Sequence, residues 1–157
     1  MEGSILVLKG TRAEVEAMAE ADPYVASGLF ESTRLVQWKK VIDKGGLGPM
    51  KPTEEMFVLE CVDKEGSLDV RLSNRDKHLA YLSEQGDAVV AAGPVIGSDG
   101  AMCGSVVVLR GGEELAKGFA AGDPYAEAGL FERVALRRWK RVVDNRAPVL
   151  HDHLPGQ

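Results

Sequence analysis

The fold is decided by a stretch of 41 residues that occurs twice in the chain. Residues 3–43 read GSILVLKGTRAEVEAMAEADPYVASGLFESTRLVQWKKVID, and residues 104–144 read GSVVVLRGGEELAKGFAAGDPYAEAGLFERVALRRWKRVVD. The two copies align at a constant offset of 101 without a gap, and 18 of the 41 paired positions are identical. The second copy follows residues 56–103, which have no counterpart upstream of the first copy. The chain is therefore predicted to hold half a domain, a linker and a complete domain.

Strand and helix signals alternate along the predicted complete domain, residues 56–144. Short apolar runs predict strands at 56–62, 88–92, 105–110 and 131–143, and apolar spacing predicts helices at 69–85 and 112–122. Leu72, Leu79 and Leu82 are expected to form the buried face of the first helix, and Gly93-Pro94 is expected to end the second strand. The order β-α-β-β-α-β predicts an α+β, ferredoxin-like fold.

The sequence Asp123-Pro124-Tyr125 predicts a local chain break and a new helix. Proline disfavours helical geometry in the residue before it, so the longer helix should end near residue 122. Asp123 is expected to cap a single helical turn that begins at Pro124 and ends at Gly129. Helix capping alone explains this aspartate, and Asp22 is its equivalent in the first copy.

Residues 1–43 reproduce only the second half of the domain, as an N-terminal βαβ half-repeat. In the usual ferredoxin-like sheet the first strand lies between the third and fourth strands. The half-repeat holds only the counterparts of the third and fourth strands, so the strand that belongs between them is missing. Unpaired strand edges are costly when buried and adhesive when exposed. The half-repeat must pack against the complete domain, borrow a strand from another chain or pair with its own copy. We expect a homodimer or higher homo-oligomer; the half-repeat is either natural or a shortened tandem domain.

Composition excludes several classes of protein. The net charge of −5 and the pI near 5.3 argue against nucleic-acid binding. No run approaches the roughly 18 apolar residues of a membrane span, and the start of the chain is no signal peptide, so we expect a cytoplasmic protein without membrane contact. Cys61 and Cys103 are expected to be buried or half-buried free thiols. Residues 44–55 are predicted to be a linker, and residues 145–157 a surface tail.

Three histidines are candidates for chemistry. His78 is the one within the predicted core; spacing alone makes it a partly exposed helix residue, although a titrating histidine beside an apolar surface is the commonest general base. His151 and His153 lie in the tail, where an accidental chelate explains them as well as a metal site does. No phosphate-binding or dinucleotide motif occurs, and no metal or cofactor is expected.

Residues 56–144 resemble the YciI-like (YCII-related) family of small ferredoxin-like proteins, and residues 3–43 resemble the second half of the same domain. The matching segments occur in the family's order and spacing: Arg75-Asp76-Lys77-His78-Leu79, Ala92-Gly93-Pro94, Gly104-Ser105, Asp123-Pro124-Tyr125 and Gly129-Leu130-Phe131. The resemblance implies the fold of a dimeric α/β barrel. It also implies a catalytic histidine on the first helix paired with the aspartate of the DPY segment.

Carried over by position, the implied catalytic residues are His78 and Asp123, with Ser105 as a third polar group. An aspartate bonded to one ring nitrogen fixes the tautomer and raises the basicity of the other nitrogen. Arg75 is a candidate for binding an anionic oxygen or is simply a surface residue, and Tyr125 either lines the pocket or packs. Members of the family resemble enzymes for elimination, including dehydrochlorination, or isomerisation on small aromatic or dienone-like rings.

The favoured hypothesis is a small, cofactor-independent lyase or isomerase in which His78 transfers a proton of a small-molecule substrate and Asp123 orients it. The competing hypothesis is a non-catalytic binding or assembly module of the same fold. Asp22 matches the motif aspartate, but the half-repeat contains no histidine to pair with it. The chain is therefore expected to hold one His–Asp site.

Overall fold

The computed structural model describes residues 3–44 and 54–142. The chain divides into two compact units, Met1–Val36 and Gln37–Gln157, which we call the N-terminal unit and the C-terminal unit. Each unit has its own helices, and the sheet belongs to the C-terminal unit.

Two predicted segments fall on residues that lie outside the described ranges. These are nearly all of the linker predicted at 44–55, and the tail predicted at 145–157 with His151 and His153. Their predicted roles therefore stay predictions.

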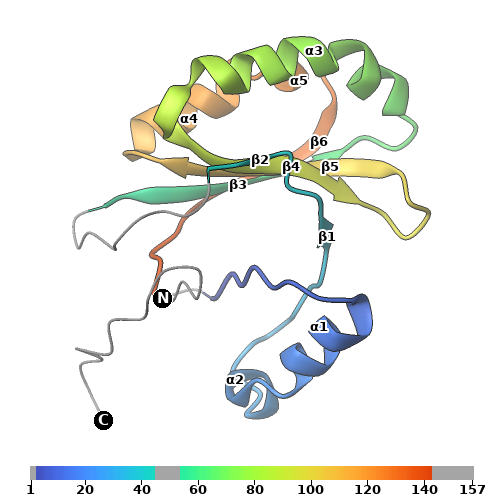
Figure 1. The fold of residues 1–157 in the computed structure, drawn as a ribbon, viewed down its shortest axis with the longest axis vertical. Coiled ribbons are helices and arrows are strands. Elements are labelled where there is room, and N and C mark those ends of the chain that lie inside the picture. Colours follow the sequence, from blue (N-terminus) through green and yellow to red (C-terminus); the bar gives the residue numbers. More distant parts are fainter. Residues whose placement is uncertain (1–2, 45–53, 143–157) are drawn as a thin grey trace. The chain divides into compact units, whose positions relative to one another are not determined.

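The C-terminal unit is an antiparallel sheet covered on one face by helices (Figure 1). Its strands are β1 (Gln37–Trp38), β2 (Ile42–Asp43), β3 (Met56–Asp63), β4 (Val89–Ile96), β5 (Met102–Arg110) and β6 (Phe131–Arg138). Its helices are α3 (Leu68–Glu84), the 3₁₀ turn Gly86–Ala88, α4 (Glu113–Gly122) and α5 (Pro124–Glu127). The order across the sheet is β1-β4-β5-β3-β6, and β2 also pairs with β4. The predicted α+β, ferredoxin-like arrangement is confirmed, with β3 between β5 and β6.

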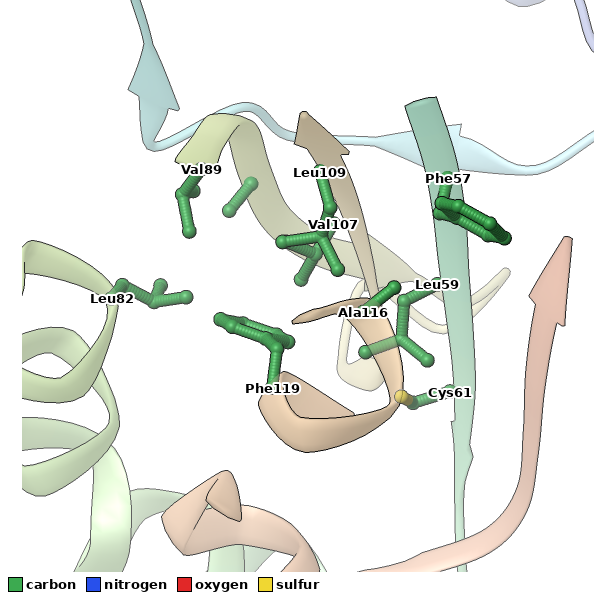
Figure 2. Packing of buried hydrophobic residues seen from close by; sticks show 10 residues of the cluster. Phe57, Leu59, Cys61, Leu82, Val89, Val107, Leu109, Ala116 and Phe119 are labelled. Atoms are coloured by element: carbon green, nitrogen blue, oxygen red, sulfur yellow. The ribbon is translucent and has the colours of Figure 1, made fainter. Parts of the chain in front are cut away.

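The hydrophobic core lies between this sheet and its helices. Alternate residues of β3, namely Phe57, Leu59 and Cys61, point to the helix side, as strand geometry requires. Figure 2 shows them meeting buried side chains from β5, α3 and α4. The other labelled members of the cluster are Leu82, Val89, Val107, Leu109, Ala116 and Phe119. The same strand face continues to Asp63, so this polar side chain also points toward the helices.

The buried face of α3 differs from the predicted one. Leu72 is exposed, Leu79 is partly buried, and the buried residues are Arg71, His78 and Leu82. The expectation of a partly exposed His78 was therefore wrong. Apolar spacing misplaced the face because two of its inward positions carry polar side chains, which find polar partners inside the protein.

Strand β4 continues through Gly93-Pro94 to Ile96 and does not end there as expected. Its outer edge is covered by β1 and β2, and Lys39 N–H donates to the Pro94 carbonyl at 3.0 Å. The Trp38 indole N–H donates to the Gly93 carbonyl at 3.0 Å. A Cβ on Gly93 would overlap the Lys39 carbonyl, so this contact requires glycine. Proline has no N–H to donate to a neighbouring strand. Pro94 is tolerated because the partners of β4 on this edge, β1 and β2, are only two residues long.

Strand β6 ends at Arg138, five residues before the predicted end at Val143, which lies outside the described range. Trp139 N–H still donates to the Met56 carbonyl at 2.8 Å, but the chain then leaves the sheet. The basic residues that follow, Lys140 and Arg141, form no strand.

The N-terminal unit forms the helices of the half-repeat but not its expected first strand. Helix α1 (Arg12–Glu20) begins at a Thr11–Glu14 capping box, and α2 (Pro23–Ala26) begins at Asp22, whose side chain accepts from Tyr24 N–H at 2.7 Å. Residues 3–9 contain no strand. The physical reason is that strands form by pairing, and residues 3–36 contain no counterpart of β3 to pair with.

None of the helices in residues 3–44 and 54–142 is both long and apolar enough to cross a lipid bilayer.

Gly93→Ala is expected to release residues 37–43 from the edge of β4, because the added methyl group overlaps the Lys39 carbonyl. Overpacking of this kind costs about 1–3 kcal/mol of unfolding free energy. Hydrogen exchange should then lose protection at the Val41 amide, which donates to Ala92. The control is Gly118→Ala in α4, where nothing lies within 4 Å of the new Cβ; helix propensity there favours alanine by up to about 1 kcal/mol. Equal protection of Val41 in both variants would contradict the assignment.

Candidate functional site

A buried histidine–aspartate pair joins α3 to the start of α5. His78 Nδ1 lies 2.8 Å from Asp123 Oδ1, and both side chains are almost fully buried. The same aspartate oxygen accepts the Tyr125 backbone N–H at 2.9 Å, as an N-cap should. Asp123 therefore holds its predicted cap position and His78 at once, and the backbone bond fixes where its carboxylate points.

Tyr125 packs against the histidine of this pair. Its ring stacks on the His78 ring with centroids 4.0 Å apart and planes 19° apart. Phe131 meets the tyrosine edge-on at 6.1 Å. Burial raises the pKa of the Tyr125 hydroxyl, and the Asp123 charge adds to that effect while Arg71 opposes it. Tyr125 is thus a neutral phenol at physiological pH, and it restricts the imidazole to one orientation.

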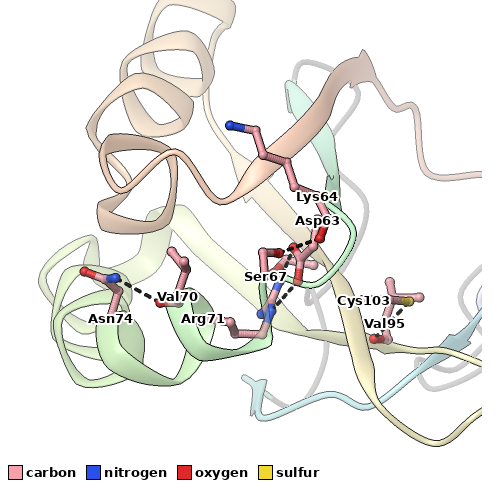
Figure 3. Close-up of polar contacts among 9 residues, drawn as sticks. Asp63, Lys64, Ser67, Val70, Arg71, Asn74, Val95 and Cys103 are labelled. Carbon is pink, nitrogen blue, oxygen red and sulfur yellow. Dashed lines mark hydrogen bonds and ion pairs between the residues drawn. The ribbon is translucent and has the colours of Figure 1, made fainter.

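The second polar group is a buried ion pair between α3 and the end of β3 (Figure 3). Arg71 donates to both oxygens of Asp63, from Nε at 2.6 Å and from Nη2 at 2.7 Å. Nη2 also donates to Ser105 Oγ at 3.0 Å, and the guanidinium lies 4.7 Å from the centre of the Tyr125 ring. Two parallel bonds of this kind are the strongest arginine–carboxylate geometry.

Burial by itself disfavours the charged guanidinium, but the hydrogen bonds and charge of Asp63 outweigh it and raise the pKa of Arg71. Arg71 therefore stays a cation. Its contact with the Tyr125 ring connects the ion pair to the His78–Asp123 pair through one aromatic side chain. The two pairs, Tyr125 and Ser105 therefore form a continuous buried cluster of six residues.

The structure brings four of the five predicted site residues into this cluster: His78, Asp123, Tyr125 and Ser105. Ser105 contacts Arg71, so it reaches the histidine through Arg71 and Tyr125. Arg75, the fifth, is exposed on α3 one turn before His78, and its charge lowers the pKa of the Tyr125 hydroxyl.

Sequence reasoning missed Asp63 and Arg71. Asp63 follows a predicted strand and Arg71 lies in a predicted helix, and both elements were predicted from their apolar residues alone. The available signal was an aspartate directly after an apolar strand, followed eight residues later by an arginine on the next helix. Polar residues at strand ends often mark sites, because loops and element ends carry function.

Cys61 borders the site but is not a reactive thiol. Burial raises the pKa of the Cys61 thiol to about 12, and the charge of Asp123 contributes further. Because the thiolate is the nucleophile, a thiol with this pKa stays inert at neutral pH. The described ranges also hold no group of three His, Cys, Asp or Glu side chains placed to bind a metal ion.

The free position of the histidine is its second nitrogen. Nδ1 is engaged by Asp123, while Nε2 has no hydrogen-bond partner among the residues of the described ranges, and 9% of the side chain remains exposed. If Nδ1 carries the proton and donates to the carboxylate, Nε2 presents a lone pair. The arrangement is able to take and return one proton.

A ferredoxin-like sheet with a buried His–Asp pair under its helices defines the class of protein. A model of the YCII-related domain matches residues 56–140. The chain therefore belongs to the YCII-related domain family.

Relatives in this family match 55% of this chain over nearly their whole length. Protein YciI of Escherichia coli O6:H1 and of Shigella flexneri are each 34% identical over 96 residues, covering 55% of this chain and 98% of theirs. An uncharacterized protein of Haemophilus influenzae is 32% identical over 95 residues. Among solved structures, the chain is similar to 5-chloro-2-hydroxyhydroquinone dehydrochlorinase from Burkholderia phenoliruptrix in complex with 2,5-dihydroxybenzoquinone, with a TM-score of 0.53 and 32% identity over 55% of this chain and 95% of that one.

Arg71→Met is expected to destabilise the protein by about 3–5 kcal/mol, because it leaves the Asp63 carboxylate buried without its cation. Asp63→Leu combined with Arg71→Met should recover a large part of that loss, since no charge then remains buried. Urea unfolding measures both. The control is Arg12→Met, which breaks the exposed Arg12–Glu16 pair and should change the stability little. Similar losses for Arg71→Met and Arg12→Met would refute a structural role for the buried pair.

The thiol chemistry gives a second expectation. A thiol with a raised pKa is neutral below that pKa, so Cys61 should not react with an aromatic disulfide reagent at pH 8 in the folded protein. Cys103 is exposed and should be the single thiol titrated. Both should react in urea. Two rapidly reacting thiols in the folded protein would be inconsistent with the buried position of Cys61.

Proposed function

We propose that the C-terminal unit is a small enzyme that needs no cofactor and catalyses proton transfer at a small hydroxylated ring. His78 is the catalytic acid and base, and Asp123 orients it. The observation that carries the proposal is the 2.8 Å contact between His78 Nδ1 and Asp123 Oδ1 with Nε2 left open. General acid–base catalysis by a positioned histidine contributes about 10²–10⁴-fold in rate.

The reaction begins when Nε2 takes a proton from a ring hydroxyl or from a carbon next to a carbonyl. The electron pair of the broken O–H or C–H bond moves into the ring. In an elimination it expels a leaving group from a neighbouring carbon. Chloride leaves as the anion and the proton on Nε2 then passes to solvent, whereas a departing hydroxyl group takes that proton and leaves as water. In an isomerisation the proton returns from Nε2 to another ring atom. The imidazolium formed in between is stabilised by the Asp123 carboxylate.

The other cluster residues have supporting roles in this proposal. Tyr125, stacked on the imidazole, keeps Nε2 directed away from Asp123. Arg71 is held in place by its hydrogen bonds to Asp63. It donates a hydrogen bond to Ser105 and lies against the Tyr125 ring. Arg75 is exposed one turn from His78 and is placed to attract an anionic ring oxygen. The polar groups around the histidine are thus already positioned before a substrate binds, which lowers the cost of reaching the transition state.

The comparisons support a ring substrate. The solved relative is named for loss of hydrogen chloride from a chlorinated hydroxyhydroquinone, and its bound molecule is a dihydroxybenzoquinone. The competing hypothesis of a non-catalytic binding module would be favoured by a wide separation of His78 and Asp123. Their direct contact supports the enzymatic proposal instead.

His78→Gln is expected to lower turnover of 5-chloro-2-hydroxyhydroquinone by about 10²–10⁴-fold while leaving the fold intact, because it removes the proton acceptor. Chloride release measures the rate. Thermal shift with 2,5-dihydroxybenzoquinone reports binding separately, since a ligand stabilises the state that it binds.

Asp123→Asn should lower the rate as well, because the neutral amide no longer stabilises the imidazolium. Asn is also a good N-cap, so α5 should persist. The matched control is Asp22→Asn: Asp22 caps α2 in the same way, but in residues 3–44 and 54–142 no histidine bonds to it, and the rate should not change. Full activity in His78→Gln would eliminate the proton-transfer proposal. An equal loss in Asp22→Asn would mean that capping, not catalysis, explains the effect.

A further inference from the structure

The N-terminal unit exposes side chains whose counterparts form the core of the C-terminal unit. Leu6 is 64% exposed, while Val107, its counterpart at the offset of 101, is 1% exposed. Met18 is 51% exposed, and its counterpart Phe119 is 2% exposed. The same holds for three further pairs: Leu8 and Leu109, Tyr24 and Tyr125, and Leu29 and Leu130. The unit therefore has the apolar face of a domain core without the element that covers it.

The N-terminal unit also has a hollow beside α1. It has a volume of about 550 Å³ and is lined by Lys9 and by four residues of α1, namely Glu14, Ala17, Met18 and Ala21. In the C-terminal unit the equivalent helix, α4, packs against β3. Of the α1 residues that line the hollow, Met18 corresponds to the buried Phe119, whereas Glu14 and Ala17 correspond to the exposed Leu115 and Gly118.

The pairing of β3 shows what kind of segment the N-terminal unit lacks. Strand β3 is antiparallel to β5 on one edge and to β6 on the other. Residues 3–9 are the counterpart of β5, and residues 30–37 are the counterpart of β6. One strand, antiparallel to both segments and accessible on both of its edges, would complete the sheet.

The C-terminal unit offers no such strand in its described residues. Strands β3, β4 and β5 are each paired on two edges, and β6 is paired with β3. Residues 3–9 belong to no strand, so both of their edges are unpaired, as are those of residues 30–36. We propose that the N-terminal units of two copies of this chain exchange this segment, so that Gly3–Lys9 of each copy lies between residues 3–9 and 30–37 of the other.

The exchange closes on itself with two-fold symmetry. The four segments lie in the order 30–37 of the first copy, 3–9 of the second, 3–9 of the first and 30–37 of the second, all antiparallel to their neighbours. Each 3–9 segment then has both edges paired, and each copy receives the strand it lacks. Symmetric, self-complementary contacts of this kind are the commonest form of homodimer.

The sequence also sets the register. Leu59 of β3 lies opposite Val107 and Leu136, whose counterparts are Leu6 and Leu35. Residues that lie opposite each other in a sheet point to the same face, so the two-fold axis must pass between two copies of the same residue. If residues 3–9 of the two copies overlap completely, that residue is Leu6, the middle one of the seven. Leu6 of one copy then lies beside Leu6 and Leu35 of the other.

The charges are compatible with this register. Residues 3–8 carry no charged side chain, so antiparallel pairing opposes no like charges. Lys9 ends the segment and takes the position of Val62, opposite Ser32 of the other copy and next to Glu31 there. Lys9 therefore lies opposite an uncharged side chain, and the pairing sets no like charges against each other.

Disulfide trapping tests the register in the full chain. In a Cys103→Ser background, Leu6→Cys should form a covalent dimer under mild oxidation, because the two sulfur atoms meet at the axis. Leu8→Cys is the matched control. Its two copies would lie four residues apart, about 14 Å, which exceeds the roughly 7 Å limit between disulfide-bonded Cα atoms. Dimers in both variants, or in neither, would overturn the proposal.

Sedimentation tests the surface without added thiols. Leu6→Asp should sediment as a smaller oligomer than the unmodified chain, because two carboxylates would meet at the axis. Leu72→Asp, at a leucine of α3 that is 51% exposed, should leave the size of the oligomer unchanged. A monomeric unmodified chain, or an oligomer of unchanged size in Leu6→Asp, would show that the uncovered face is not closed by a second copy.

Discussion

The central position of β3 is the constraint on which the rest of the structure depends. Its two ladders hold β5 and β6 apart by one strand, and its inward residues supply one side of the core. Its last residue, Asp63, anchors Arg71 and thereby the base of the candidate site. Where the chain repeats the neighbouring elements without this strand, the helices still form but residues 3–9 do not become a strand. Local capping is enough for the helices, whereas a strand requires a partner.

The capping aspartate shows how a structural residue becomes part of a site. Asp22 and Asp123 occupy identical motifs and accept the same backbone N–H bond, at 2.7 Å and 2.9 Å. Only Asp123 also meets a histidine, because α3 passes over it in the C-terminal unit. The catalytic proposal therefore rests on the helix that the half-repeat lacks, and not on the motif that the two copies share.

The sequence was sufficient for the element order of the complete domain, for the DPY cap and for the pairing of His78 with Asp123, because these follow from periodicity, local chemistry and family resemblance. The sequence was insufficient where contacts inside the folded protein outweigh the local residue pattern. Arg71 and Asp63 satisfy each other inside the protein, which no single-residue preference indicates. Strand β4 passes through Gly93-Pro94 because residues far away in the sequence pair with it, so the local turn signal was misleading. Both failures have the same cause: long-range partners decide the outcome.

The segment that covers β4 has a consequence for solubility. An open strand edge invites the addition of further strands, which is the first step of fibrous aggregation. Residues 37–43 occupy that edge in this protein, and Gly93 admits them closely. At the opposite side of the sheet, the edge strand β6 carries the charged side chains of Arg133, Arg137 and Arg138, which form ion pairs with glutamates. Charged side chains on an edge strand discourage further strands from joining there. Both edges of the sheet are thus protected, one by residues 37–43 and the other by charged side chains.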